Sequence, residues 1–286
     1  MKARVDIVEV TPRDGLQDVK PWVDTATKME LIQRLVEAHA TWIEVTAFVS
    51  PVLVPQMADA EDVMAQLPEG AAEWIGLIPN LRGYERARRV RTRHLTYVVS
   101  ASPRHQQDNV RRPLSTSLQE FGQLAARQDG PALRGAISCA FGSPYAEEVI
   151  HPQTVAAIAR QYRDYGAAEV VLADTVGAAT PDVVRTIVAK VQDALGGLPV
   201  AVHFHDRLRQ GRENVREALA LGVRRFEAAL AGLGGCPFAP QAPGNLNTIR
   251  LATWLDEWGY ETGLDLFRLE ATEKWLGQVL ALLPQG

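Results

Sequence analysis

The sequence predicts a single (β/α)8 TIM barrel, and three observations carry this prediction. Short β-branched runs alternate with longer amphipathic stretches along most of the chain. Eight such runs can be distinguished, and parallel pairing follows because each return connection takes up a helix. The chain has 286 residues, 47% of them hydrophobic, which suits one closed barrel of roughly 250 residues. We expect one domain over residues 1–286, with the barrel at about 5–260 and a helical tail at about 263–283.

The predicted strands are short runs rich in Val, Ile and Leu. In chain order they are Val5–Val10, Trp42–Thr46, Trp74–Ile78, Leu95–Val99, Arg134–Cys139, Glu169–Ala173, Val200–His203 and Arg225–Ala229. Between them lie helical stripes, such as the one over residues 31–36, with apolar residues three and four apart. Asp24 or Thr25 can cap the first helix, and Pro152 and Pro181 suit first-turn positions.

Composition and charge exclude several classes of protein. The formal net charge is −4, whereas a nucleic-acid-binding protein usually presents a basic face. The Arg-rich stretch from Arg82 to Arg93 has the spacing of the solvent side of a helix. No run approaches the roughly 18 apolar residues of a membrane span, and two cysteines are too few for a disulfide framework. We expect a cytoplasmic protein without a targeting segment, a nucleic-acid partner or a membrane anchor.

Polar side chains gather just after the predicted strands. In a parallel barrel the carboxyl ends of all strands surround one mouth, where active sites lie. The residues placed there are Arg13, Asp14, Glu44, Thr46, Asn80, Ser100, Ser138, Cys139, Asp174, Thr175, His203, His205, Gly235 and Cys236. This one-sided placement predicts an enzyme whose active site is at the carboxyl ends of the strands.

The run His203-Phe204-His205-Asp206 predicts a metal site. Residues two apart in a strand share a face, so both imidazoles converge; two hydrogen-bonded core histidines are the alternative. Asp14 offers an anionic oxygen and Asn245 a neutral one. Two nitrogens and two oxygens suit Mg²⁺ or Mn²⁺ at least as well as Zn²⁺, so we expect a divalent cation here.

Arg13 lies next to Asp14 and carries a permanent positive charge. Such a charge meets the electrostatic requirement of carbon–carbon cleavage beside a thioester, where an enolate oxygen forms; a surface ion pair is the alternative. Glu44 ends a buried-looking run and needs a partner, for which Arg13 is the natural candidate. The glycine-rich segment Gly232–Pro237 suggests a mobile lid, on which Cys236 is either a buried bystander or a proton-exchanging thiol.

Together these motifs resemble the hydroxymethylglutaryl-CoA lyase family. The resemblance follows the family order over about residues 5–265. It is carried by Val8–Gln17, Ile43–Pro51, Val54–Met57, Pro79–Leu81, Ser138–Gly142, Asp174–Gly177, His203–Asp206, Gly232–Pro237 and Gly244–Leu246. The Arg-Asp-Gly-x-Gln and His-x-His elements are shared with isopropylmalate-synthase-like and pyruvate-carboxylase-like barrels. The Val-Pro-Gln-Met and Gly-Gly-Cys-Pro segments are more specific to the lyases.

The resemblance implies metal-dependent cleavage of a 3-hydroxy-3-methylacyl-CoA, in the simplest case hydroxymethylglutaryl-CoA to acetyl-CoA and acetoacetate. The implied metal ligands are Asp14, His203, His205 and Asn245, and the implied catalytic residues are Arg13, Glu44, Asp174, His203 and Cys236. Arg13 would stabilise the enolate, His203 or Asp14 would take the hydroxyl proton, and Cys236 would help protonate the acetyl-CoA carbanion. Substrate contacts are expected from Gln17, Asn80, Ser138, Thr175, Arg207 and Arg209.

Two segments depart from the family pattern. After His205-Asp206 the family usually has Thr-Tyr-Gly-Gln, whereas this chain has Arg207-Leu208-Arg209-Gln210. The two arginines either point to solvent and pair with nearby acids, or one of them grips the carboxylate of a shorter substrate such as citramalyl-CoA. In the tail, residues 281–283 (Ala-Leu-Leu) stand where the family has an Asn and a Lys that engage CoA.

The residues therefore leave several functions open. The nearest alternative is a citramalyl-CoA lyase that releases acetyl-CoA and pyruvate. A small aldolase, a condensing enzyme and a non-catalytic ligand-binding barrel are more distant alternatives. A homo-oligomer also stays open.

Overall fold

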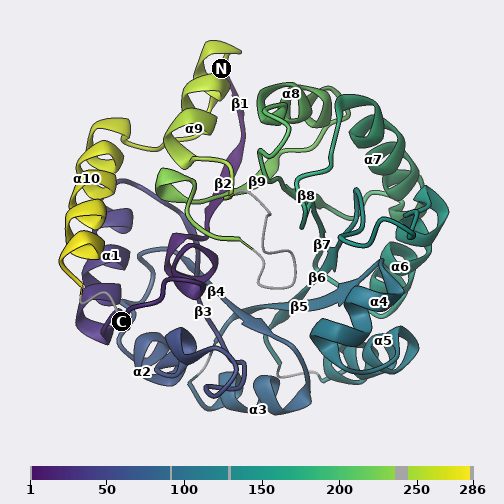
Figure 1. The fold of residues 1–286 in the computed structure, drawn as a ribbon, viewed down its shortest axis with the longest axis horizontal. Helices are drawn as coiled ribbons and strands as arrows, with labels where there is room; N and C mark the ends of the chain where they lie inside the picture. The colour runs from purple at the N-terminus through teal and green to yellow at the C-terminus, as the bar shows by residue number, and fades with distance from the viewer. Residues whose placement is uncertain (1, 91, 128–129, 236–243, 284–286) are drawn as a thin grey trace.

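The computed structural model describes residues 2–90, 92–127, 130–235 and 244–283. Eight parallel strands form a closed barrel in which β2 pairs with β9, and this confirms the predicted fold (Figure 1). The strands are β2 (Asp6–Glu9), β3 (Trp42–Ala47), β4 (Glu73–Ile78), β5 (His94–Ser100), β6 (Ala132–Ser138), β7 (Glu169–Ala173), β8 (Val200–His203) and β9 (Arg225–Ala228). Every one begins and ends within two residues of its predicted run.

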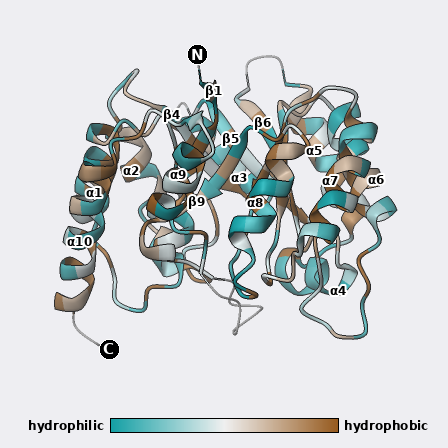
Figure 2. Cartoon of the chain, turned by 90° about the horizontal axis from the view of Figure 1, so that it is seen from above, coloured by the Kyte–Doolittle hydropathy of each residue, from teal (hydrophilic) through white to brown (hydrophobic). Residues whose placement is uncertain are grey.

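Helices surround the barrel and flank the strands on both sides in a perpendicular view (Figures 1 and 2). They are α1 (Thr25–Glu37), α2 (Ala60–Ala65), α3 (Leu81–Arg89), α4 (Pro103–His105), α5 (Leu114–Ala125), α6 (Pro152–Asp164), α7 (Pro181–Leu195), α8 (Gly211–Ala220), α9 (Thr248–Glu257) and α10 (Leu266–Leu282). The side chain of Asp24 caps α1, and Pro152 and Pro181 open α6 and α7 as predicted. Gly166 and Gly222 follow helix ends with φ of 90° and 88°, values that favour glycine.

The core has two parts of different character. Apolar side chains such as Ile43, Leu95 and Phe226 fill the space between strands and helices. The barrel interior instead holds charged side chains among small apolar clusters: Arg134 and Glu227 are 2% and 4% exposed. Buried charges are costly unless they are paired, so this interior has to be organised as a network.

Several local features differ from the predictions. A two-stranded parallel pair, β1 (Ala3–Arg4) with β10 (Tyr260–Glu261), was not foreseen. Helix α3 ends at Arg89, so Arg93 lies outside it, and Arg86 is half-buried in an ion pair with Glu61 rather than facing solvent. Among the described helices, none has the length and apolar character needed to cross a bilayer.

Candidate active site

A tight turn at the end of β2 places two charged side chains over the barrel mouth. Residues Thr11–Gly15 form one turn of π-helix, closed by the backbone N–H groups of Asp14 and Gly15, which donate to the carbonyl of Val10 over 2.8 and 3.1 Å. Such π-turns are rare and occur frequently at functional sites. This turn buries both Arg13 and Asp14 just beyond the end of β2.

Strand β8, which is separated from β2 only by β9, supplies the two histidines. His203 is its last residue, and His205 follows in an isolated antiparallel bridge to Asn245. This bridge fixes Asn245 beside the histidines, three residues before α9 begins. Residues distant in sequence thus meet at one point of the mouth.

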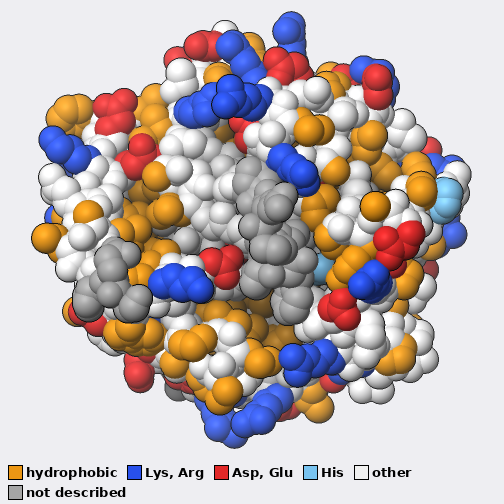
Figure 3. Space-filling model, viewed as in Figure 1, with side chains coloured by type: hydrophobic (Ala, Val, Ile, Leu, Met, Phe, Trp, Pro, Cys, Tyr) orange, Lys and Arg blue, Asp and Glu red, His pale blue; other side chains and the backbone are white. Residues whose placement is uncertain are grey.

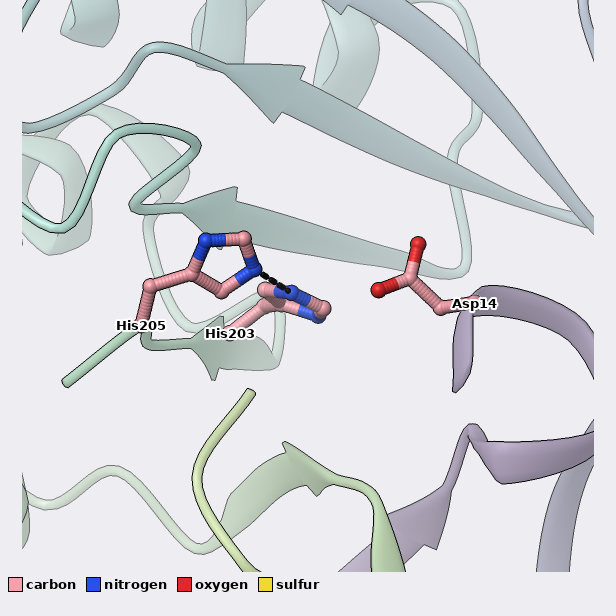
Figure 4. A group of neighbouring side chains, drawn as sticks. All are labelled: Asp14, His203 and His205. Carbon is pink, nitrogen blue, oxygen red and sulfur yellow. Dashed lines mark hydrogen bonds between the residues drawn. The ribbon is translucent and has the colours of Figure 1, made fainter. Parts of the chain in front are cut away.

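Asp14, His203 and His205 form a buried group able to hold a metal ion. Their nearest ligand atoms all lie within 4.8 Å of one another. The Nε2 atoms of the histidines are 3.1 Å apart, and Figure 4 shows both rings and the Asp14 carboxylate directed toward a common point. Two imidazoles and a carboxylate are a common ligand combination for divalent metals.

Asn245 completes this group, and the hydrogen bonds of its side chain show whether a cation would fit there. Its amide nitrogen donates to Asp14 Oδ2 over 2.7 Å and to the carbonyl of Leu233 over 2.7 Å. Its Oδ1 is buried without a hydrogen-bond partner among the described residues. Buried polar atoms are rarely left without a partner, so an oxygen in this state beside a carboxylate and two imidazoles is suited to bind a cation.

The electrostatics of the group favour binding of a cation. Burial would raise the pKa of Asp14, but Arg13 and His203 hold it below its ordinary value, so the carboxylate is ionised. Burial, together with the charge of His203, lowers the pKa of His205 to about 4. A neutral His205 offers a nitrogen lone pair, which is the form that binds metals.

Arg13 is paired on both sides. Its Nε donates to Glu44 Oε2 over 2.5 Å, as predicted, and its Nη1 donates to Asp14. Burial alone would lower the pKa of Arg13, but the charges of Asp14 and Glu44 raise it above its ordinary value. The guanidinium therefore stays positive and is held rigidly next to the metal-binding group.

A cavity of about 210 Å³ opens above these residues. Of the residues expected to contact substrate, Gln17, Ser138 and Thr175 line it, together with Arg13, Asp14, Glu44, His203 and His205. Apolar side chains such as Val49, Val98 and Val171 form other parts of its wall. The cavity is therefore polar near the metal-binding group and apolar elsewhere, which suits a small acyl group.

Two predicted residues have structural roles nearby. The side chain of Asn80 accepts the backbone N–H of Gly83 over 3.0 Å and caps α3; it lines a neighbouring cavity of about 370 Å³. Burial raises the pKa of Asp174 to about 7. The backbone N–H groups of Ala178 and Ala179 donate hydrogen bonds to its carboxylate and partly counteract this rise. Asp174 thus organises the loop after β7 rather than lining the cavity.

The two arginines that depart from the family pattern lie elsewhere. Arg209 lines a separate cavity of about 590 Å³ between α8 and α9, and Arg207 is exposed. Neither forms an ion pair with Asp206 or Glu213 in the described part of the chain. Arg209 has φ of 54°, a left-handed conformation that favours glycine. Lys and Arg side chains are mixed with Asp and Glu around this face of the molecule (Figure 3).

The glycine-rich segment is described only in part. Cys236 and Pro237 lie outside the described residues, so the implied role of Cys236 stays a prediction. Gly234 has φ of 107°, and a Cβ there would lie 2.5 Å from Asn245 Nδ2 and 2.9 Å from Asp14 Oδ2. Only glycine fits against the metal-binding group at this position.

Sequence reasoning missed the charged side chains beneath the site. Glu227 lies against His203, and Arg134 lies against Glu227. Burial would raise the pKa of Glu227, but Arg134 and His203 lower it to about 2. His105, which is buried and lines the cavity, was also not foreseen. Charged residues inside buried strand runs were the available signal, because each must find a partner.

Comparisons with known proteins agree with this geometry. The HMGL-like family model matches residues 4–276. An (R)-citramalyl-CoA lyase from Chloroflexus aurantiacus is 38% identical over 289 residues, covering 96% of this chain and 91% of that protein. A hydroxymethylglutaryl-CoA lyase from Pseudomonas mevalonii is 38% identical over 265 residues, covering 92% of this chain and 88% of that protein.

A solved structure extends the likeness to three dimensions. It is that of an HMG-CoA lyase from Acinetobacter baumannii in complex with coenzyme A and 3-methylmalate. The TM-score is 0.92 at 36% identity, with 97% of this chain and 92% of that chain covered.

Fold and site together define a barrel enzyme with a metal-binding group at its mouth. Because the family model and these relatives span nearly the whole sequence, the chain belongs to the HMGL-like family. It is a carbon–carbon lyase, and the resemblance seen in its motifs is confirmed.

Proposed function

We propose that the protein uses a divalent cation, Mg²⁺ or Mn²⁺, to cleave a 3-hydroxy-3-methylacyl-CoA. The most direct substrate is 3-hydroxy-3-methylglutaryl-CoA, split into acetyl-CoA and acetoacetate. The observation that carries this proposal is the buried group of Asp14, His203, His205 and Asn245 with the paired guanidinium of Arg13 beside it. The names of the relatives support the substrate class.

The residues have complementary tasks in this reaction. Asp14, His203, His205 and Asn245 would hold the cation, which supplies Lewis acidity to substrate oxygens when bound. The substrate hydroxyl loses its proton to the Asp14 carboxylate, the C2–C3 bond breaks, and the electron pair of that bond moves to the thioester enolate. Arg13 stabilises that enolate oxygen, and Glu44 keeps the guanidinium in place. The acetyl-CoA carbanion must then be protonated, and we propose Cys236 as the proton donor.

A second substrate is favoured by one specific observation, the 38% identity to an (R)-citramalyl-CoA lyase. Citramalyl-CoA carries the same reacting atoms but has its carboxylate one methylene closer to the carbinol carbon. Cleavage would give acetyl-CoA and pyruvate. The cavity volume of about 210 Å³ accommodates either short acyl group.

The experiment is a panel of acyl-CoA thioesters with Mg²⁺ or Mn²⁺, in which both products are followed. We expect release of acetyl-CoA together with acetoacetate from hydroxymethylglutaryl-CoA. Pyruvate from citramalyl-CoA at a higher kcat/KM would transfer the assignment to the second substrate. Absence of acetyl-CoA from every 3-hydroxy-3-methylacyl-CoA in the panel would overturn the proposal.

A further inference from the structure

A layer of buried charges lies directly beneath the metal-binding group. Glu227 of β9, Arg134 of β6 and Glu169 of β7 are 4%, 2% and 3% exposed, respectively. Nothing in the reaction above uses them. Three ionisable groups in a barrel interior are costly to bury, so their retention calls for a specific task or tight mutual compensation.

The contact between Glu227 and His203 determines which ring nitrogen of His203 carries a hydrogen. Glu227 Oε2 is 3.0 Å from His203 Nδ1. An ionised carboxylate only accepts hydrogen bonds, so Nδ1 carries a hydrogen and donates it. The other ring nitrogen, Nε2, then keeps its lone pair in the neutral ring, and this is the atom that faces His205 and the metal-binding group.

Arg134 in turn fixes Glu227. One guanidinium nitrogen donates to Glu227 Oε1 over 2.9 Å, a second to Glu169 Oε2 over 2.7 Å, and the third to Thr96 Oγ1 over 3.1 Å. Both oxygens of Glu227 are therefore engaged, one by Arg134 and one by His203. A planar guanidinium with all three nitrogens occupied leaves the carboxylate little rotational freedom.

We propose that Glu227, held by Arg134, is a positioning residue that fixes the orientation and hydrogen placement of His203 so that its Nε2 is directed at the cation. Carboxylates that accept the distal N–H of a metal-binding imidazole typically set ring orientation and raise ligand basicity. The inference rests on the metal centre of the proposed function but not on the identity of the substrate.

Two variants of matched burial separate positioning from simple structural support. Glu169→Gln and Glu227→Gln each remove one acid from Arg134, but only Glu227 touches His203. We expect Glu227→Gln to bind Mn²⁺ about 10–100-fold more weakly, measured by electron paramagnetic resonance titration, and Glu169→Gln to keep the wild-type affinity. Saturating Mn²⁺ should then restore much of the lost turnover in Glu227→Gln. Equal Mn²⁺ affinities of the two variants would overturn the proposal.

A measurement on the wild-type protein covers the case in which Glu227→Gln fails to fold. In the Mg²⁺-loaded protein labelled with ¹⁵N-histidine, we expect a protonated Nδ1 on His203, assigned through the loss of its signals in His203→Gln. An unprotonated Nδ1 would overturn the proposal. If Mn²⁺ binds and depends on Glu227 but no thioester is cleaved, the proposed substrate fails while the positioning role stands.

Discussion

The Nε2 atoms of His203 and His205 face each other at 3.1 Å, inside the barrel and away from bulk water. At this separation the two nitrogens either share one proton or direct both lone pairs at a cation between them. Burial and the charge of His203 lower the pKa of His205 to about 4, so the His205 ring is neutral and its Nε2 keeps a lone pair in either state. The nearby Asp14 carboxylate completes a negatively charged receptor for a divalent ion.

Metal dependence follows from this pair. We expect chelation to abolish turnover and added Mn²⁺ or Mg²⁺ to restore it. His203→Ala should weaken Mn²⁺ binding on the order of 100-fold or more, since it removes one ligand outright, whereas loss of a ligand's supporting contact alone costs 10–100-fold. Isothermal titration with Mn²⁺ measures this effect.

His94 provides the matched control. It starts β5 and pairs with Glu73 over 2.8 Å, which places it at the end of the barrel away from the mouth. His94→Gln should keep Mn²⁺ affinity and turnover. Activity that survives chelation, or a His203→Ala variant with unchanged affinity, would refute the metal centre.

Arg13→Met should lower turnover by about 10²–10³-fold, because it removes one preorganised charge from a developing oxyanion. Metal content should change little, since Asp14 and both histidines remain. Some stability should be lost, because Glu44 would be left buried without its partner. Steady-state kinetics and metal analysis on the same preparation separate these effects.

Arg86→Met serves as the comparison for Arg13. Arg86 forms an ion pair with Glu61 at 2.5 Å outside the barrel mouth, so its loss should affect stability without slowing the reaction. Near-normal turnover of Arg13→Met would mean that Arg13 serves only as a partner in a structural ion pair.

Gly234→Ala should disrupt the metal-binding group from outside the ligand set. The added Cβ would lie 2.5 Å from Asn245 Nδ2, and φ of 107° is unfavourable for alanine. Asn245 or the loop must shift, so we expect weaker Mn²⁺ binding. Gly259→Ala shares the positive φ, 82°, but meets open space, so it should lose stability while keeping its Mn²⁺ affinity. Equal Mn²⁺ affinities in the two variants would contradict the close contact.

Local sequence patterns predicted the barrel well because each strand is a β-branched run between helix signals. The β7 run Glu169–Ala173 and the β8 run Val200–His203 have the predicted bounds. The β1–β10 pair escaped prediction because each strand has only two residues, too few to carry a periodic signal. Helix α3 ends at Arg89, with Val90 as its C-cap, so it does not extend to Arg93 as the spacing of the arginines predicted.

The residues of the candidate site likewise divide into those that local sequence patterns predict and those that depend on contacts between distant parts of the chain. Residues at strand ends, such as His203 and Asp14, could be predicted because barrel topology brings those ends together. The link from Glu227 to Arg134 could not, since it joins residues 93 apart whose approach depends on barrel closure. The π-turn that carries Arg13 over the mouth likewise has no periodic pattern that a sequence reveals.

Arg209→Gly should stabilise the protein and leave substrate choice unchanged. Arg209 has φ of 54°, and relief of this left-handed conformation is worth about 1 kcal/mol, or roughly 2–4 °C in Tm for a chain of this size. Its side chain lines the cavity between α8 and α9 rather than the one above the histidines. The ratio of kcat/KM for citramalyl-CoA and hydroxymethylglutaryl-CoA should therefore stay constant. Arg207→Gly, at a position without positive φ, should give no gain in Tm. A changed ratio in Arg209→Gly would instead show that this arginine reaches the substrate carboxylate.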